Sequence, residues 1–403
     1  MRLPLLRTAS LLCFAVLAPG GLTALGTAPA ASAGPGTSDP WVYAWGHNAS
    51  GQLGNGSTTG ARSPGAVLGL ARGDVKAVST GGWVTDNNSF TVALLKNGTL
   101  KSWGNSQFGQ LGNGTTTAQS VPGTVTGLTG VRALDTGCYH GVALRGGRVW
   151  TWGRNNSGQL GTGAPLPGTG ELAAATAPVE VQSLDRVKAI AAGCTFTVAL
   201  REDGTVWTWG NNASGQLGNG TTTNANTPQQ VPGLSDVDAI DAGAAHAVAV
   251  TRDRKVMSWG LNAEGELGID STVNSSKPVE VRHLSAVNRV FAGPYNTFAL
   301  LADGSVKGWG WNDRGQLGDR TTINRTTPHP VAALTGAREI SPGHKHTLAV
   351  LEDQSVIAFG ANDQGQLGDG TATDSPVPLT VLPAGSGVGH VAGGYVTSVS
   401  FAY

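Results

Sequence analysis

An all-β propeller is the fold class that this 403-residue sequence predicts, and three recurring features predict it. The first is a twelve-residue motif, WGNNASGQLGNG at residues 209–220, which recurs seven times at intervals near fifty residues. The second is a glycine that precedes a short apolar strand, as in residues 193–200. The third is the pattern Pro-x-x-Val-x-x-Leu. A fixed period of about fifty residues is typical of repeat proteins, and propellers are built from such units.

The motif begins as a strand and continues as an ordered loop. Trp207 and Trp209 alternate with smaller residues, so both indoles are expected on one face of a strand. The strand should end at Gly210, because the Asn and Gly residues that follow tolerate positive φ and bond their own backbone. Leu217 is expected to point inward and anchor the loop. The seven copies begin at Trp45, Trp103, Trp152, Trp209, Trp259, Trp309 and Phe359.

The other two features complete each repeat. Asp203-Gly204 lies between two apolar stretches and predicts a hairpin turn. Each repeat then contains three or four antiparallel strands, which is the content of one blade. The recurring glycines are Gly81, Gly137, Gly193, Gly243, Gly293, Gly343 and Gly393. The proline pattern begins at Pro64, Pro122, Pro178, Pro228, Pro278, Pro328 and Pro376, with Leu in place of Val in the last copy.

The two ends of the repeat region predict a closed ring. The first tryptophan strand, with Trp41, Tyr43 and Trp45, has no strand of the repeat before it. The last glycine strand, residues 393–401, has no tryptophan strand after it. Together the two strands complete one blade, and pairing them removes the exposed edges of an open sheet.

Residues 1–33 have the pattern of a secretory signal peptide. Arg2 and Arg7 precede the apolar run 11–18, and Ala31-Ser32-Ala33 is a small-x-small cleavage site. The alternative is a membrane anchor, but Pro19 and two glycines interrupt the apolar run well short of about 20 residues. We expect cleavage after Ala33, a linker at 34–40, a propeller over 41–403 and a secreted protein, either free or associated with the cell envelope.

Charge and motifs disfavour several functional classes. The net charge is zero, and loss of Arg2 and Arg7 with the leader leaves two more acidic than basic residues, so a nucleic-acid partner is not expected. No pattern typical of a catalytic centre or cofactor site is found, so we expect no enzyme, no cofactor and no metal. Three histidines, His140, His246 and His346, follow the recurring glycine by three residues. That regularity favours structural histidines that bond backbone between blades over metal ligands.

Cys138 and Cys194 each follow the recurring glycine in consecutive repeats. Equivalent positions near a propeller axis lie close together, and an exported protein meets oxidising conditions. A Cys138–Cys194 disulfide is therefore predicted, with two buried free thiols as the alternative.

Aromatic residues gather two positions after the recurring glycine. We take this position as the candidate partner-binding face, at one end of the central channel, since Tyr and Trp concentrate binding energy at interfaces. The alternative is that the rings only fill the channel mouth. The residues expected at this face are Trp83, Tyr139, Tyr295, Lys345 and Tyr395, with Phe196 and His344 beside them.

The repeat over 41–403 resembles that of the regulator of chromosome condensation family, with its W-G-x-N-x-x-G-Q-L-G motif and A-G-x-x-H-T-x-A-L strand. The resemblance implies a seven-bladed β-propeller. It does not settle function, because members do unrelated jobs on one scaffold. The nuclear member exchanges guanine nucleotide on a small GTPase, and the plant ultraviolet-B photoreceptor uses a Gly-Trp-Arg-His-Thr cluster that this chain lacks.

A non-catalytic scaffold that binds an extracellular protein is the function these features favour. Three alternatives stay open: a guanine-nucleotide exchange regulator, a protein similar to a secreted bacterial β-lactamase inhibitor of related repeat, and a polysaccharide-binding protein. The third draws on Trp83 and Trp311, whose indoles could stack on sugar rings.

Overall fold

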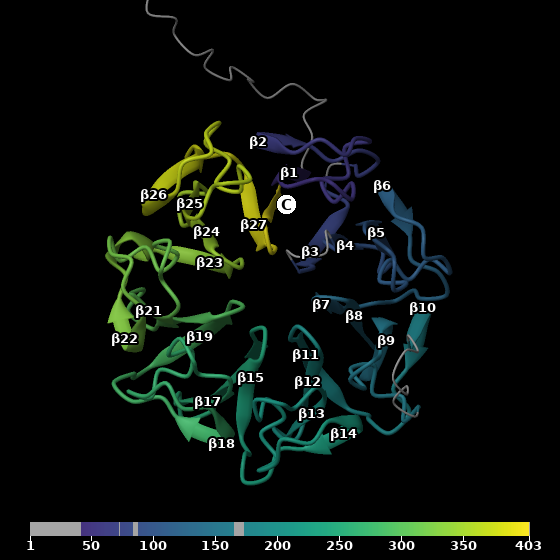
Figure 1. Ribbon diagram of the computed structural model, residues 1–403, viewed down its shortest axis with the longest axis vertical. Coiled ribbons are helices and arrows are strands. Elements are labelled where there is room, and N and C mark those ends of the chain that lie inside the picture. Colours follow the sequence, from purple (N-terminus) through teal and green to yellow (C-terminus); the bar gives the residue numbers. More distant parts are fainter. Residues whose placement is uncertain (1–41, 72, 84–87, 165–172, 403) are drawn as a thin grey trace, which may run out of the picture. The chain divides into compact units, whose positions relative to one another are not determined.

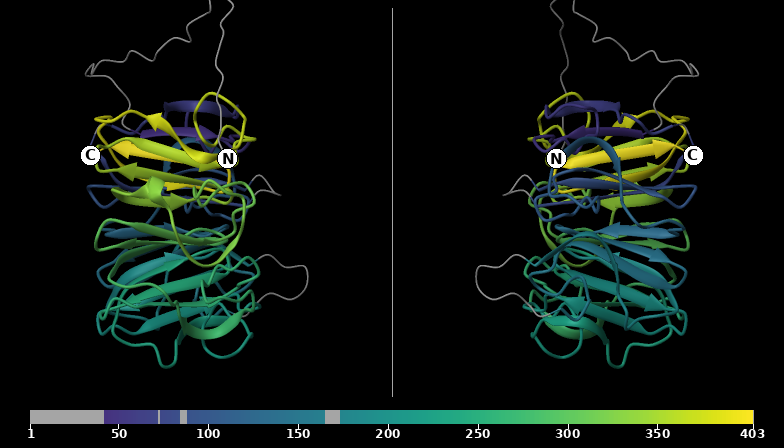
Figure 2. Two further views of the ribbon diagram at one scale, coloured as in Figure 1. Left: turned by 90° about the vertical axis from the view of Figure 1, so that its left-hand side faces the viewer. Right: turned by 90° about the vertical axis from the view of Figure 1, so that its right-hand side faces the viewer.

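The computed structural model describes residues 42–71, 73–83, 88–164 and 173–402, and within them the chain forms seven four-stranded antiparallel sheets. Each sheet is one blade, and the blades surround a central axis, with one edge strand of each blade innermost (Figure 1). Seen from the side, the strands run along that axis (Figure 2). The predicted seven-bladed, all-β propeller is confirmed. The predicted signal peptide and linker, 1–33 and 34–40, lie outside the described residues.

Blades 1 to 3 follow one another in sequence. Blade 1 contains β3 (Val75–Gly81), β4 (Phe90–Leu95), β5 (Leu100–Gly104) and β6 (Gln119–Thr124). Blade 2 contains β7 (Ala133–Thr136), β8 (His140–Arg145), β9 (Arg148–Arg154) and β10 (Ala174–Glu180). Blade 3 contains β11 (Val187–Ala192), β12 (Phe196–Arg201), β13 (Val206–Gly210) and β14 (Ala225–Gln230).

Blades 4 to 6 repeat this order. Blade 4 contains β15 (Val237–Ala242), β16 (His246–Thr251), β17 (Val256–Gly260) and β18 (Ser275–Glu280). Blade 5 contains β19 (Val287–Ala292), β20 (Asn296–Leu301), β21 (Val306–Gly310) and β22 (Arg325–Pro330). After a short 3-10 turn, Ala332–Leu334, blade 6 contains β23 (Ala337–Pro342), β24 (His346–Leu351), β25 (Val356–Gly360) and β26 (Ser375–Leu382).

Blade 7 closes the ring with strands from both ends of the described chain. Its order is β2 (Ala61–Ala66), β1 (Val42–Gly46), β28 (Thr397–Ala402) and β27 (Val388–Gly393). Strands β1 and β28 pair antiparallel from Val42 opposite Phe401 to Gly46 opposite Thr397. The predicted closure is confirmed. In the described part of the chain, no helix is long and apolar enough to cross a membrane.

The core lies between blades, and the twelve-residue motif holds neighbouring blades together. Each hydrophobic cluster joins the inward faces of two adjacent blades, as Phe196 and Val198 of blade 3 meet Trp259 of blade 4. The motif indole donates to a backbone carbonyl in the loop of the preceding blade, as Trp209 Nε1 does to Gln159 O at 2.9 Å. The motif leucine points inward as expected, with Leu217 fully buried.

The three repeated histidines are structural, but their partner differs from the expected one. His140, His246 and His346 are fully buried. Each Nε2 contacts a hydroxyl of the next blade instead of backbone: Thr197 Oγ1 at 3.1 Å, Thr297 Oγ1 at 3.0 Å and Ser398 Oγ at 2.9 Å. Each hydroxyl in turn donates to a motif-loop carbonyl, as Thr197 does to Gln159 O at 3.0 Å. Because that hydroxyl proton is already used, the imidazole Nε2 carries a proton and is the donor.

Candidate functional site

The innermost strands end at one face of the ring in short links to the second strands, and these links surround the channel mouth. Their backbone bonds run from blade to blade, from Cys138 N to Cys194 O at 3.1 Å, Cys194 N to Ala244 O at 3.0 Å and Ala244 N to Pro294 O at 3.1 Å. The predicted Cys138–Cys194 disulfide is present, with Cα atoms 4.4 Å apart. The disulfide covalently ties blade 2 to blade 3 at the mouth.

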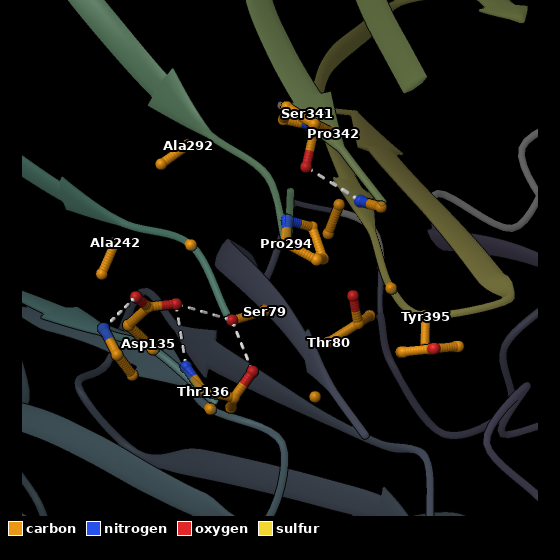
Figure 3. Close-up of a pocket in the computed structure, with 18 of the residues that line it drawn as sticks. Ser79, Thr80, Asp135, Thr136, Ala242, Ala292, Pro294, Ser341, Pro342 and Tyr395 are labelled. Atoms are coloured by element: carbon orange, nitrogen blue, oxygen red, sulfur yellow. Dashed lines mark hydrogen bonds between the residues drawn. The ribbon is translucent and has the colours of Figure 1, made fainter. Parts of the chain in front are cut away.

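Behind the mouth, the channel has a volume of about 290 Å³ and is lined by the innermost strands. Asp135 joins three blades there: its carboxylate accepts from Ser79 Oγ at 2.9 Å, Thr136 N at 2.8 Å and Ala192 N at 2.8 Å (Figure 3). Asp241 joins blades 4 and 5 in the same way, through Ala242 N and Ala292 N, both at 2.8 Å. Burial raises the pKa of Asp241 to about 7. Through these bonds the two carboxyls hold neighbouring blades together along the channel wall.

Five rings gather at the mouth, and we call them the mouth cluster: Trp83, Tyr295, Trp311, His344 and Tyr395. Trp83 lies 5.1 Å from Tyr395 and 6.5 Å from Tyr295 between ring centroids. His344 stacks on Tyr395 at 3.7 Å. Tyr295 meets Trp311 edge-on at 5.4 Å. Links and loops of four blades thus contribute to one aromatic surface at one end of the channel.

The mouth cluster is neutral in itself and has one cation against it. Burial, with smaller effects of Lys345 and His346, lowers the pKa of His344 to about 3, so this imidazole is uncharged at neutral pH. The His344 Nε2 and Tyr395 Oη atoms are hydrogen-bonded at 2.7 Å. Burial raises the pKa of the Tyr395 phenol, which stays protonated. The Lys345 ammonium lies 4.6 Å from the Trp311 ring centroid, within cation–π distance.

An acidic side chain lies beneath the cluster. Glu266 of blade 4 stands where the other six copies of the motif have Gln, and it is fully buried. Burial raises its pKa to about 7. The pKa of Tyr295 is raised first by burial and then by the charges of Glu266 and Glu264. The Tyr295 phenol is therefore a neutral hydrogen-bonding group at neutral pH.

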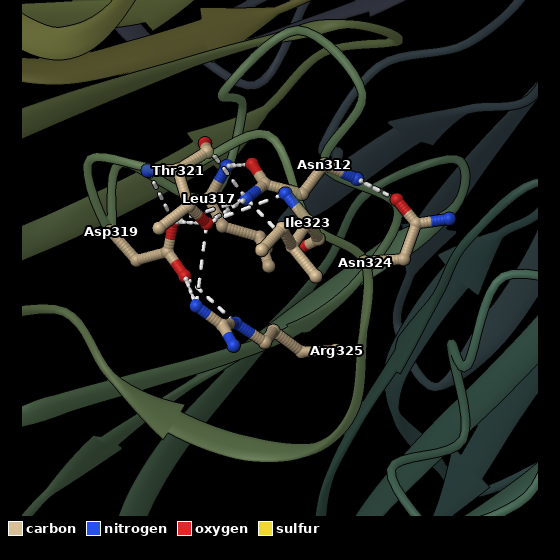
Figure 4. Close-up of polar contacts among 7 residues, drawn as sticks. All are labelled: Asn312, Leu317, Asp319, Thr321, Ile323, Asn324 and Arg325. Atoms are coloured by element: carbon tan, nitrogen blue, oxygen red, sulfur yellow. Dashed lines mark hydrogen bonds and ion pairs between the residues drawn. The ribbon is translucent and has the colours of Figure 1, made fainter.

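Trp311 is held by a rigid loop. The neighbouring Asn312 accepts from Leu317 N at 2.8 Å and donates to Asp319 Oδ1 at 3.0 Å and to Thr321 O at 3.1 Å (Figure 4). Asp319 also pairs with Arg325 at 2.7 Å. An indole carried by such a hydrogen-bonded loop loses little conformational freedom on binding.

A cleft opens beside Trp83, His344 and Tyr395, with a volume of about 470 Å³. Its lining also includes the polar side chains of Asp363 and Gln364. The mouth therefore offers aromatic surface and hydrogen-bonding groups side by side. Among the described residues, no group of three or more His, Cys, Asp and Glu side chains is placed to hold a metal ion.

Trp83, Tyr295, His344, Lys345 and Tyr395, all predicted for the face, do meet at the mouth. Tyr139 lies in a second group, at 5.5 Å from Phe108 and 5.1 Å from the Arg154 guanidinium carbon. Tyr139 is nearly buried there, with only 7% of its surface exposed. The site therefore has a main cluster and a smaller neighbouring one.

Phe196 is not at this face, and its prediction was wrong. It is fully buried in the core between blades 3 and 4, where its ring packs against the Gly193 backbone. It occupies the place that His140 and His246 take in blades 2 and 4. Phe196 is buried because the first side chain of this second strand faces the next blade.

The predicted single column of aromatics also needs correction. In most blades the N–H of the recurring glycine donates to the carbonyl of the residue three positions later. In blade 7 it is Gly394, not Gly393, that makes this bond, from its N to Thr397 O at 2.7 Å. Tyr395 is thus equivalent to His344 and Cys138, one place earlier than expected. In blade 1, a longer link follows β3 and contains Trp83, while Ser89 occupies the column position. Different links bring these rings to the same mouth.

Sequence reasoning left out Phe108, Arg154 and Glu266, and considered Trp311 only for the polysaccharide alternative. A signal for two of them was present in the repeat itself. Arg154 stands where other copies have His47, Asn105 or Asn211, and Glu266 stands where they have Gln. Where one repeat has a different polar residue at an equivalent position, the hydrogen-bond partners of that residue must differ as well.

Comparison with known proteins agrees with this architecture. Residues 167–402 match the RCC1-like domain, and residues 41–85 and 97–144 match the regulator of chromosome condensation (RCC1) repeat. The chain belongs to the RCC1 family. Two solved structures share the fold of this RCC1-family propeller. Yeast RCC1 (Prp20), solved bound to Kap60, gives a TM-score of 0.77 at 22% identity over 89% of this chain and 88% of its own. Human WBSCR16 gives 0.78 at 22% identity over 90% and 99%.

Curated relatives match over shorter stretches. The human E3 ubiquitin-protein ligase HERC2 is 31% identical over 181 residues, which are 45% of this chain and 4% of HERC2. The ultraviolet-B receptor UVR8 of Arabidopsis thaliana is 31% identical over 184 residues, 44% of this chain and 39% of UVR8. The chain thus spans less than half the length of these relatives.

Proposed function

We propose that this RCC1-family propeller is a secreted, non-catalytic scaffold that binds another protein through the mouth cluster. The observation that carries the proposal is the convergence of Trp83, Tyr295 and Trp311, all partly exposed, on one end of the channel. Rigid aromatic side chains with polar neighbours are the usual energetic centres of protein interfaces. Yeast RCC1, which shares the fold, has been solved bound to the protein Kap60.

Export is part of the proposal and rests on two features. Residues 1–33 have the pattern of a signal peptide. The Cys138–Cys194 disulfide is typical of oxidising compartments outside the cytosol. A propeller with such a bond is suited to a partner met outside the membrane.

A cell-envelope polysaccharide is the second candidate partner. Asp363, Gln364 and Gln366 line the cleft together with Trp83. Aromatic surface with amide and carboxylate neighbours can also bind a sugar. Protein remains the first choice, because the mouth cluster extends beyond the cleft to Tyr295 and Trp311.

The test compares partner capture by matched variants of the mature protein. Trp83→Ala and Trp311→Ala remove mouth rings. Trp207→Ala is the control, since this partly exposed indole lies on β13 against Arg201, away from the mouth cluster. A photo-crosslinking residue in place of Trp83, or of Trp207, identifies what touches each position in native secreted and wall fractions.

We expect one protein to be retained by wild type and by Trp207→Ala, and to crosslink only from position 83. Trp83→Ala and Trp311→Ala should no longer retain that protein, although their thermal unfolding temperature should match that of the Trp207→Ala control. A retained glycan that oligosaccharide displaces would establish the second candidate instead. Equal retention by all variants would refute binding at the mouth.

A further inference from the structure

The motif glutamine carries an amide that needs an acceptor at the surface of the ring. In three blades, that acceptor is the residue just after the motif Trp-Gly. Gln110 Nε2 donates to Asn105 Oδ1 at 3.0 Å, Gln216 Nε2 donates to Asn211 Oδ1 at 2.7 Å, and Gln52 Nε2 lies 2.8 Å from His47 Nδ1. In two other blades an aspartate two residues further on accepts, as Asp363 does from Gln366 at 3.0 Å.

Blade 2 departs from this arrangement, because Arg154 replaces the acceptor. The backbone is unchanged: Arg154 N bonds Tyr139 O at 2.9 Å, just as Asn211 N bonds Thr195 O at 2.9 Å. Gln159 is fully buried, and its Oε1 accepts from Ser157 N at 2.9 Å as in the other blades. With the same Oε1 bond, its Nε2 takes the side that Arg154 occupies in place of the acceptor of three other blades, and it has no partner among the described residues; Asn156, at the position of Asp313 and Asp363, makes no bond to it.

Among the described residues, the Arg154 guanidinium also has no polar partner. Its Nε is buried and makes no hydrogen bond, and no carboxylate of the described residues forms an ion pair with it. Its position is nevertheless fixed, since its central carbon lies 5.0 Å from the Phe108 ring and 5.1 Å from the Tyr139 ring. The two rings are perpendicular and 5.5 Å apart, and Arg154 remains partly exposed.

Two adjacent donor groups with one net positive charge define the missing species. It must carry negative charge and present at least two acceptor atoms to the guanidinium and the amide. A carboxylate meets both conditions, because its two oxygens match the planar donor fork of arginine. Leaving buried donors unpaired is unfavourable, and a carboxylate that accepts from both would remove that cost on binding.

We propose that Arg154 and Gln159 form a carboxylate-binding subsite beside the mouth, which takes an Asp or Glu side chain of the partner protein. The inference rests on the proposed function for its source of carboxylate. Tyr139, which holds Arg154, directly follows Cys138 of the channel rim. A partner seated on the mouth cluster would therefore find this subsite on the same face.

The test titrates purified, 15N-labelled mature protein with small probes. N-acetyl-aspartate N-methylamide supplies the carboxylate, and N-acetyl-asparagine N-methylamide is its neutral isostere. Inorganic phosphate tests the anion class. NMR follows Arg154 Nε–H and the Gln159 side-chain amide, which report on the subsite without any partner.

Two variants accompany the wild type. Arg154→Asn restores the acceptor that Asn105 and Asn211 provide, so it should fold at least as well as the parent. Arg154→Lys keeps the charge but loses the planar donor fork.

We expect saturable shifts of both signals with the aspartate probe and none with its isostere. Binding should weaken at least about tenfold in Arg154→Lys and vanish in Arg154→Asn. Absence of saturable binding in wild type, equal binding by Arg154→Asn, or preference for phosphate would overturn the inference.

Partner affinity separates this inference from the proposed function. We expect Arg154→Asn to weaken partner binding at least about tenfold, more strongly at low salt. If Trp83→Ala loses the partner and Arg154→Asn does not, the carboxylate subsite is wrong and the mouth proposal stands. If the probe binds but no partner depends on the mouth rings, the subsite stands and the proposed function fails.

Discussion

The bond between a motif tryptophan and the preceding blade can be tested at a position with no second donor. Gln159 O accepts from both Trp209 Nε1 at 2.9 Å and Thr197 Oγ1 at 3.0 Å. Gln216 O accepts from Trp259 Nε1 at 3.0 Å. Ala247 occupies the place of the threonine there, opposite Trp259 in the sheet. Removing the indole donor therefore leaves one carbonyl bonded and the other unpaired.

Blade 6 shows that phenylalanine fits this place. Phe359 replaces the tryptophan, and Thr347 Oγ1 supplies the bond to Gln316 O at 2.8 Å. Trp209→Phe and Trp259→Phe should therefore lose similar apolar contact. Trp259→Phe should cost about 1–2 kcal/mol more in the free energy of unfolding, because a buried acceptor is left without a donor.

Equilibrium denaturation in urea measures both variants and a rescue. Adding Ala247→Thr to Trp259→Phe recreates the Thr–Phe pair of blade 6 and should recover about 1 kcal/mol. Ala247→Thr alone controls for the added methyl and hydroxyl. Equal costs for the two tryptophan variants, or no recovery in the double variant, would show that this bond does not stabilise the packing between blades.

Three further predictions concern the same ring. Replacing Cys138 and Cys194 by Ser should leave the fold intact but lower its stability by about 4 kcal/mol, because a closed loop of 56 residues is released; unchanged thermal unfolding would contradict this. Burial lowers the pKa of His246 to about 3, so its contribution to stability is lost as pH falls below about 6.5. Between pH 6.5 and 5, the free energy of unfolding in urea should therefore fall in wild type by up to about 2 kcal/mol more than in His246→Phe. Parallel pH profiles of the two proteins would refute this. Ser400→Pro, which removes a β28 donor opposite Tyr43 at the ring closure, should destabilise all blades in one transition; hydrogen exchange confined to blade 7 would argue against a cooperative ring.

Most of the fold could be predicted because the same sequence pattern occurs in seven repeats. The Trp-Gly strand, the inward Leu217 and the meeting of β1 with β28 follow from local pattern and from the register of the two ends. The disulfide followed from equivalence of Cys138 and Cys194 in consecutive blades. These features depend on period, and a period is readable from one sequence.

The site was harder to predict, because it depends on departures from the period. Counting from Gly393 misplaced Tyr395, since Gly393 and Gly394 are adjacent and only the hydrogen bond to Thr397 decides between them. Phe196 looked like a surface ring, but its strand face packs against the next blade. The unpaired Gln159 amide became visible only in the structure, where Arg154 occupies the position of the acceptor in other blades.

The affinity of a captured partner for matched tryptophan variants tests the central claim most directly. Isothermal titration of that partner against wild type, Trp83→Ala and Trp207→Ala compares a mouth ring with an indole elsewhere. The mouth cluster predicts a loss of about 2 kcal/mol or more, roughly thirtyfold in Kd, for Trp83→Ala and wild-type affinity for Trp207→Ala. Wild-type affinity in Trp83→Ala would show that the rings only fill the channel mouth.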